Sequence, residues 1–234
     1  MFKVWWQSKE NNFGDILNPH IFDYFQINYK FSHLEAADTL CIGSVIRRAR
    51  ENFNVLGSGI MFSKDKPHPK ANYHFVRGPR TRENILLNGG HCPPIYGDPA
   101  LLLPLFCNES KKKYDLGIVP HFVDYDFVKE TYPNYHVIDL LNKDPLEVAK
   151  QITECRHIIS SSLHGIIAAH AYQIPAAWVK FSNNIKGDDI KFYDYFEGVN
   201  SIPILSTLEK PKYQTVSYDI KNIINAFNAL NKET

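Results

Sequence analysis

Short apolar runs rich in β-branched and aromatic residues recur along the whole chain, and stretches with helical patterning separate them. The runs are FKVWW, DTLCIGSVI, FNVLGSG and YHFV in the first half, and YDLGIVPH, YHVIDLL, HIISSS and AAWVKF in the second. Strands that alternate with helices in this way form parallel sheets, because each helix returns the chain to the edge where the next strand begins. We therefore predict an α/β fold of two Rossmann-like lobes that face a cleft, where open parallel sheets hold their ligands.

The boundary between the lobes is predicted in GDPALLLPLFCNESKKKYD, residues 97–115. Two prolines, a polar stretch and three consecutive lysines are typical of a solvated connector. We place an N-terminal Rossmann-like lobe at 1–108 and a C-terminal one at 109–234. The last apolar repeat, YDIKNIINAFNALN, has helical spacing and predicts a final helix that packs back against the body of the protein.

Composition limits the partners of the chain. The 234 residues carry a net charge of +1, so no overall field attracts nucleic acid, and an anion has to be bound by a local cluster. No apolar run approaches the roughly 20 residues of a membrane span, and the first residues lack the apolar core of a signal peptide. Four separated cysteines form no C-x-x-C pair, which argues against a zinc site or a disulfide framework. We expect a cytoplasmic protein, and peripheral association with the inner face of a membrane stays open.

Three serines and a histidine meet where a predicted strand ends and a helix begins, in HIISSSLHGIIAAHAYQ. Ser160, Ser161 and Ser162 end the strand, and His164 stands in the first turn of the helix. Free backbone N–H groups and the helix dipole favour a phosphate or carboxylate at that point. Gly165 allows close approach of a ligand or of a neighbouring strand. The structural alternative is that the serines cap the helix and that His164 packs against the sheet.

Arginine residues concentrate in the first half, where six of the seven lie between positions 47 and 82. Arg77 follows the strand YHFV and is expected to face the cleft, with Arg80 one turn further on. A guanidinium binds carboxylate or phosphate through two parallel hydrogen bonds. Arg80 also fits an exposed helix face, and Arg47, Arg48 and Arg50 fit the surface as well as they fit the site.

Two acidic residues follow glycines in loops that would border the same cleft. NFGDILNP places Asn12, Gly14 and Asp15 after the first strand, and Asn18–Pro19 can begin a helix as cap and first residue. In YGDPALLL, Asp98 can cap a helix, which is its structural alternative. A carboxylate at either position could also accept a proton from a sugar hydroxyl.

Two basic side chains directly follow strands of the second half. His121 comes after the strand in GIVPH, and Lys180 ends the strand in AAWVK. Each can reach the cleft from there, although a loop histidine commonly has no chemical role. The aromatic residues of KGDDIKFYDYF are interpreted as packing residues of a helix.

Taken in order, NFGDILNP, VRGPRTRENI, YGDPALLLP, GIVPH, SSSLHGIIAAHAYQIPAAWV and KGDDIKFYDYF resemble the polysaccharide pyruvyl transferase family over most of the chain. The resemblance implies a two-lobed fold like that of the GT-B glycosyltransferases. It also implies transfer of a pyruvyl group from phosphoenolpyruvate to two hydroxyls of a sugar as a cyclic ketal, with release of phosphate. The residues it carries over are Asp15, Arg77, Asp98 and His164. Many members resemble S-x-R-L-H before the second-lobe helix, whereas this chain has Ser162 at the position of that arginine.

The implied chemistry needs an acid, a base and groups that stabilise anions. We expect His164 to be the acid or the phosphate partner, Asp98 or Asp15 to be the base, and Arg77 to anchor the donor. Phosphoenolpyruvate is the expected donor, with no further cofactor and no metal. The acceptor sugar is left open as lipid-linked, polymeric or part of a glycoprotein glycan.

Two other functions stay open at this point. A nucleotide-sugar glycosyltransferase can have the same two-lobed architecture, since a fold does not fix a function. A non-catalytic glycan-binding protein is the second alternative, because Ser162 departs from the family pattern.

Overall fold

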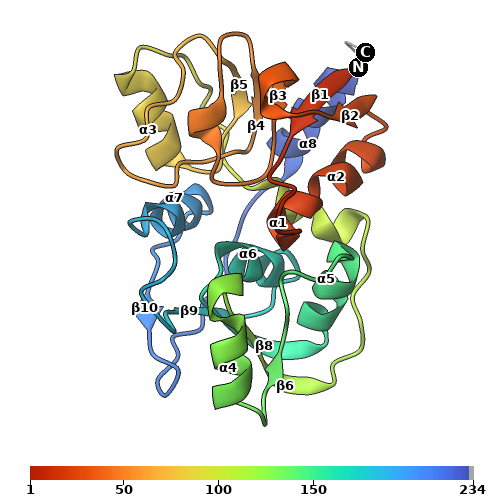
Figure 1. The fold of residues 1–234 in the computed structure, drawn as a ribbon, viewed down its shortest axis with the longest axis vertical. Coiled ribbons are helices and arrows are strands. Elements are labelled where there is room, and N and C mark those ends of the chain that lie inside the picture. Colours follow the sequence, from red (N-terminus) through yellow and green to blue (C-terminus); the bar gives the residue numbers. More distant parts are fainter. Residues whose placement is uncertain (232–234) are drawn as a thin grey trace.

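Two five-stranded sheets, each parallel throughout, form the framework of the computed structural model, which describes residues 1–231 (Figure 1). The first has the strand order β2-β1-β3-β4-β5 and consists of β1 (Phe2–Trp5), β2 (Tyr29–Phe31), β3 (Thr39–Leu40), β4 (Asn54–Leu56) and β5 (Asn72–Phe75). The second has the order β10-β9-β8-β6-β7 and consists of β6 (Tyr114–Val119), β7 (His136–Val137), β8 (Cys155–Ser160), β9 (Ala176–Val179) and β10 (Leu205–Ser206).

Each of the eight predicted apolar runs contains or overlaps one of these strands, so the expected α/β class with two parallel sheets is confirmed. The sequence does not signal β2 and β10, and both are edge strands. Neither contains a buried residue, which removes the apolar pattern by which a strand is predicted.

Helices flank both sheets, and loops connect the carboxyl ends of the strands to these helices. The α-helices are α1 (Phe13–Ile16), α2 (Asn18–Tyr24), α3 (Pro79–Leu87), α4 (Tyr125–Thr131), α5 (Pro145–Thr153), α6 (Leu163–Ala171), α7 (Ile190–Gly198) and α8 (Lys221–Asn231). Short 3-10 helices are η1 (Leu34–Ala36), η2 (Ile46–Arg48), η3 (Pro99–Leu105) and η4 (Phe122–Asp124). Within residues 1–231, no helix has the length and apolar character needed to cross a membrane.

Helix α6 lies at the centre of the molecule, between the second sheet and η3. All its residues except His164 are buried, so it has apolar surface on every side. Gly165 is required by close packing on the strands, because a Cβ there would lie 2.5 Å from Ser160 Oγ and 2.7 Å from Val119 Cγ1. Of the two interpretations of this glycine, close approach to a neighbouring strand is the one that the structure shows.

The first half of the predicted connector 97–115 is not a linker. Asp98 begins η3 by accepting a hydrogen bond from the backbone N–H of Ala100, and residues 100–103 are completely or almost completely buried against α6. The apolar run ALLL therefore belongs to the core, since burying it removes a large apolar area from water. The exposed connection between the sheets is shorter and includes the lysine run.

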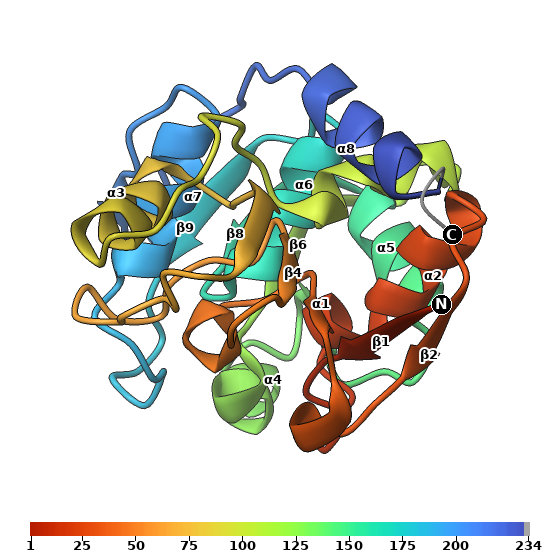
Figure 2. The same ribbon diagram turned by 90° about the horizontal axis from the view of Figure 1, so that it is seen from above.

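Two helices from the second half of the chain contact the first half (Figures 1 and 2). In α8, Phe227 stacks on Phe25 with ring centroids 4.7 Å apart and meets the edges of Phe22 and Phe75. Helix α7 packs on α3. A boundary between residues 108 and 109 thus separates the strands of the two sheets but not the helices that cover them.

Candidate active site

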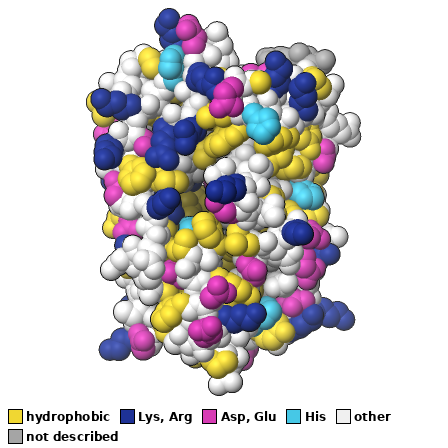
Figure 3. All heavy atoms as spheres, viewed as in Figure 1, with side chains coloured by type: hydrophobic (Ala, Val, Ile, Leu, Met, Phe, Trp, Pro, Cys, Tyr) yellow, Lys and Arg dark blue, Asp and Glu magenta, His cyan; other side chains and the backbone are white. Residues whose placement is uncertain are grey.

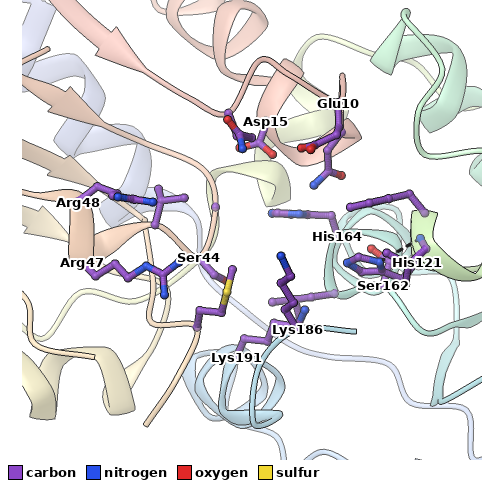
Figure 4. A pocket seen from close by; sticks show the side chains of 18 of the residues that line it. Glu10, Asp15, Ser44, Arg47, Arg48, His121, Ser162, His164, Lys186 and Lys191 are labelled. Atoms are coloured by element: carbon purple, nitrogen blue, oxygen red, sulfur yellow. Dashed lines mark hydrogen bonds between the residues drawn. The ribbon is translucent and has the colours of Figure 1, made fainter. Parts of the chain in front are cut away.

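A cavity of about 380 Å³ lies between the carboxyl ends of the two sheets (Figure 4). Its walls come from the loops after β1, β3, β6 and β8, together with the segment around the start of α7. This volume is typical of small-molecule sites, and parallel sheets hold ligands at this end. Charged or imidazole side chains on its walls are Glu10, Asp15, Arg47, Arg48, His121, His164, Lys186 and Lys191.

Basic and acidic side chains are interspersed over the face of the molecule drawn in Figure 3. This agrees with the net charge of +1. The wall of the cavity is different, because it carries four Lys or Arg side chains against two carboxylates. An anion would therefore be bound by a local cluster, as the composition predicts.

His164 is held between a buried carboxylate and a glycine. Its Nε2 lies 3.6 Å from Oδ2 of Asp98, and neither atom has a hydrogen-bond partner among residues 1–231. On the opposite side, a Cβ on Gly14 would lie 2.2 Å from His164 Nδ1, so only glycine leaves room for the ring. The imidazole remains 12% exposed and lines the cavity. This arrangement fixes the orientation of a potential proton donor or acceptor.

Asp98 does not line the cavity, although it was expected as a candidate base. Its side chain is fully buried, and Oδ1 accepts the N–H of Ala100 at 2.9 Å. Asp98 both caps η3, as its structural alternative predicts, and approaches His164 from behind. Its position suits a group that orients His164 rather than one that touches a substrate.

Asp15 reaches the cavity from the short helix α1, which follows β1 where the sequence predicts a loop. Burial raises the pKa of this carboxyl to about 6, and the nearby His164 partly opposes the shift. Asn12, also expected at the site, lines the same wall. Asn18 does not cap α2 as predicted, because it lies inside the helix, where its side chain donates to the Asp15 carbonyl at 2.8 Å and accepts from the N–H of Ile42 at 3.1 Å. Those two bonds tie α1, which carries Asp15, to the segment that follows β3.

Of the three serines, only Ser162 borders the cavity. Ser160 Oγ donates to the Val119 carbonyl at 2.7 Å and accepts the N–H of Ser162, so it fastens β8 to β6. Ser161 Oγ accepts the backbone N–H of His121 at 2.8 Å. No side chain caps α6, which leaves its first N–H groups free of a capping oxygen at the cavity.

His121 lies on the cavity wall, as its position after β6 predicts. Burial lowers the pKa of its imidazole to about 4, and Lys191 and His164 lower it further. The ring is therefore neutral at physiological pH. Its Nδ1 accepts the backbone N–H of Val123 at 3.4 Å, which leaves Nε2 to carry the proton and to donate.

Arg77 is completely buried and does not line the cavity, contrary to the expectation that it faces the cleft. Its Nε donates to Asp194 Oδ2 at 3.0 Å, Nη1 to Ser44 Oγ at 2.7 Å and Nη2 to the Ile60 carbonyl at 2.6 Å. All three nitrogens are thus occupied by the protein. The physical reason is that α7 packs on α3 and supplies Asp194 from a point 117 residues further along the chain.

Arg80 and Lys180 also lie off the cavity wall. Arg80 makes two hydrogen bonds of 2.8 Å with Glu197 on the exposed side of the α3–α7 contact, which matches its surface alternative. Lys180 pairs with Asp189 at 2.5 Å and borders a separate groove beside β10.

Four cations at the cavity were missed or left undecided. Arg47 and Arg48, in η2, were considered as surface or site, and the structure places both on the wall. Lys186 and Lys191 were not singled out. The sequence of α7 carries no signal for Lys191, because a lysine three residues before an aspartate is equally typical of an exposed helix face.

Fold and cavity together define a class of protein, namely an α/β protein whose two parallel sheets enclose a cationic site equipped with acid–base groups. Comparison with known proteins is in line with this. The model of the family described as polysaccharide pyruvyl transferase matches residues 7–183, and the chain belongs to that family.

Two curated relatives give further points of comparison. The chain is 32% identical over 191 residues to the uncharacterized protein L143 of Acanthamoeba polyphaga mimivirus, an alignment covering 77% of this chain and 64% of the relative. It is 28% identical over 211 residues to the succinoglycan biosynthesis protein ExoV of Rhizobium meliloti (strain 1021), covering 83% of this chain and 64% of that protein. The chain thus spans less than two thirds of either relative. No solved structure matches it significantly.

Proposed function

We propose that this chain transfers the pyruvyl group of phosphoenolpyruvate to two hydroxyls of a sugar in a polysaccharide or its precursor, forming a cyclic ketal and releasing phosphate. The observation that carries the proposal is that one cavity combines four cations with Asp15 and an oriented His164. Family membership and the similarity to a protein named for succinoglycan biosynthesis support it. The proposal includes a GT-B-like arrangement of the lobes and a cytoplasmic location.

The charge of the cavity suits the donor. Phosphoenolpyruvate is small and carries both a carboxylate and a phosphate, so it needs several cationic or N–H donors in a limited volume. Arg47 and Arg48 approach from the first half of the chain, and Lys186 and Lys191 from the second (Figure 4). Arg77, the expected anchor, acts behind this wall by holding Ser44, which lines the cavity.

The reaction balances without a further reagent. A proton added to the methylene carbon makes the adjacent enol carbon electrophilic, and the first sugar hydroxyl adds to that carbon as its proton passes to a base. The bond from this carbon to the phosphate oxygen then breaks as the second hydroxyl adds. The two hydroxyl protons account for the new C–H bond and for the proton on the released phosphate.

Two side chains have suitable positions for the proton transfers. His164 holds the proton that goes to the methylene carbon, because Asp98 orients its ring from behind. Asp15 accepts the proton of the attacking hydroxyl, since a carboxyl with a pKa of about 6 is an effective base near neutral pH. Asp98 is a positioning residue in this scheme.

A binding titration tests the donor, and product analysis tests the reaction. We expect calorimetry to show saturable binding of phosphoenolpyruvate. Incubation with a panel of oligosaccharides, free and lipid-linked, is expected to release phosphate and to give a ketal detectable by mass spectrometry. His164→Ala is expected to lower the rate on the order of a hundredfold or more.

The matched control is His91→Ala, which removes an exposed histidine that does not line the cavity. Equal activity of folded His164→Ala and wild type would overturn the assignment of His164. Binding of UDP or GDP without binding of phosphoenolpyruvate would instead identify a glycosyltransferase.

A further inference from the structure

Lys191 is a buried cation without a counterion. It lies in the first turn of α7 with 7% of its surface exposed, and it contributes to the wall of the cavity. Within residues 1–231, its Nζ makes no hydrogen bond and has no carboxylate within 4.0 Å. Its one close partner is the Phe192 ring, 5.4 Å from Nζ to the ring centroid. Burying an unpaired ammonium is unfavourable, so its retention points to an anion that pairs with it.

Two nearby carboxylates are committed to other partners. Asp189, whose charge acts on Lys191, pairs with Lys180. Asp194 lies three residues further along α7, a spacing at which side chains meet on a helix. Its Oδ1 accepts the backbone N–H of Thr81 at 2.8 Å, and its Oδ2 accepts Arg77 Nε at 3.0 Å. Because Thr81 and Arg77 occupy both carboxylate oxygens of Asp194, this side chain does not neutralise Lys191, whose ammonium is available to a ligand in the cavity.

The first turn of α6 faces the same cavity. Ser162, Leu163 and His164 all line it, and the nine-residue helix has no side-chain cap. Lys191 and His164 both depress the pKa of His121, so both lie close enough to this ring for their charges to act on it. Figure 4 shows Lys191 on the opposite side of the cavity from Asp15 and Glu10. The cation is thus separated from the acidic wall.

We propose that Lys191 and the first turn of α6 form one subsite for a phosphoryl group, in which Lys191 is the principal phosphate ligand. This rests on the proposed function in one respect, namely that the phosphoryl group is that of phosphoenolpyruvate and afterwards the released phosphate. Lys191 lies outside residues 7–183, to which the family model applies. Helix N-termini and ammonium groups both bind phosphate oxygens, and neither requires a particular donor molecule.

The electrostatic surroundings give this subsite a pH dependence. Burial lowers the pKa of Lys191 to about 8, Arg77 and Lys180 lower it as well, and Asp189 opposes them. His121, whose imidazole is also influenced by the charge of Lys191, has a pKa of about 4 and stays neutral near pH 8. The ammonium is therefore charged at neutral pH and loses its proton in mildly alkaline solution.

The test is a calorimetric titration of the full chain with phosphoenolpyruvate and, separately, with inorganic phosphate. The titrations are repeated from about pH 7 to about pH 9.5, because the second ionisation of a phosphate monoester is nearly complete over this range and the charge of the ligand changes little. Wild-type affinity is expected to fall on the order of tenfold across this range. Lys191→Arg is expected to keep the affinity at neutral pH and to lose the pH dependence, because a guanidinium stays charged. Lys191→Met is expected to bind at least about tenfold more weakly at neutral pH.

Lys113→Met is the matched control, since this exposed lysine pairs with Glu154 and does not line the cavity. Unchanged affinity in folded Lys191→Met, or a wild-type profile as flat as that of Lys191→Arg, would overturn the subsite. Should Lys191→Met fail to fold, the profile of Lys191→Arg decides. Binding of inorganic phosphate that depends on Lys191, without binding of phosphoenolpyruvate, would support the subsite and contradict the proposed donor. Failure of both ligands to bind wild type would overturn the subsite too.

Discussion

Two buried polar regions lie side by side in this molecule and differ in how their groups are paired. At the α3–α7 interface, Arg77 and Asp194 have a protein partner for each guanidinium nitrogen and each carboxylate oxygen. In the cavity, Lys191 has no counterion, and the facing atoms of His164 and Asp98 have no hydrogen bond. The first region joins the two halves of the chain, and the second offers its charges to a ligand.

The difference teaches how to separate structural from functional charges. A buried ion pair whose hydrogen bonds are complete contributes to the fold, and removing one partner strands the other in a medium of low dielectric constant. A buried charge with incomplete partners destabilises the fold until a ligand binds. Substitutions in the two regions should therefore change stability in opposite directions.

The largest effect is expected from Arg77→Met. This change leaves Asp194 buried without its cation and should lower the free energy of unfolding by about 3–5 kcal/mol. Denaturant unfolding monitored by circular dichroism measures it. The matched control is Arg80→Met, whose pair with Glu197 is on the surface and should be worth less than about 1 kcal/mol. Equal losses in the two variants would contradict the distinction.

A somewhat smaller effect is expected from His170, another buried group with complete partners. Its Nδ1 lies 3.0 Å from the Tyr195 hydroxyl and its Nε2 3.1 Å from the Gln214 carbonyl, which suits a neutral ring. Burial lowers the pKa of His170 from 6.5 to about 4. Between these two pH values the unfolded chain binds more protons than the folded one, so stability falls as the pH is lowered through this window.

His170→Gln removes this acid-dependent loss of stability, which in wild type amounts to roughly 3 kcal/mol between pH 6.5 and about pH 4. Unfolding at a series of pH values should show a flatter profile for the variant than for wild type. Parallel profiles would mean that His170 is not buried in its neutral form.

The smallest effect, and the one of opposite sign, is expected from Asp15→Asn. The pKa of Asp15 is raised from 3.8 to about 6, so ionisation of this carboxyl opposes folding above that range. Removing the charge should raise the free energy of unfolding at neutral pH by about 1–3 kcal/mol, and the gain should vanish below the unfolded-state pKa. The same variant should lose pyruvyl transfer on the order of a hundredfold or more. A destabilised Asp15→Asn at neutral pH would contradict the assignment of Asp15 to the second region.

The sequence predicts the parts of the site that depend on local pattern. The strand-to-helix junction at Ser162 and His164, the cap formed by Asp98 and the position of Asp15 soon after the first strand all follow from turn and cap preferences over a few residues. That they come together follows as well, because the carboxyl ends of parallel strands lie at one edge.

The pairing of the cations could not be predicted in the same way. Whether Arg77 or Lys191 is free for a ligand depends on Asp194, which is distant in sequence from Arg77 and is brought to it only by packing of α7 on α3. Strand-end position alone therefore favoured the wrong cation.

The most direct test of the central claim is a crystal structure of the protein with phosphoenolpyruvate. We predict that the phosphate lies against Lys191 and the first turn of α6, with the methylene carbon within reach of His164 and with Arg77 still bound to Asp194. Phosphoenolpyruvate bound outside the cavity, or held by an Arg77 that has left Asp194, would contradict the division into structural and functional charges.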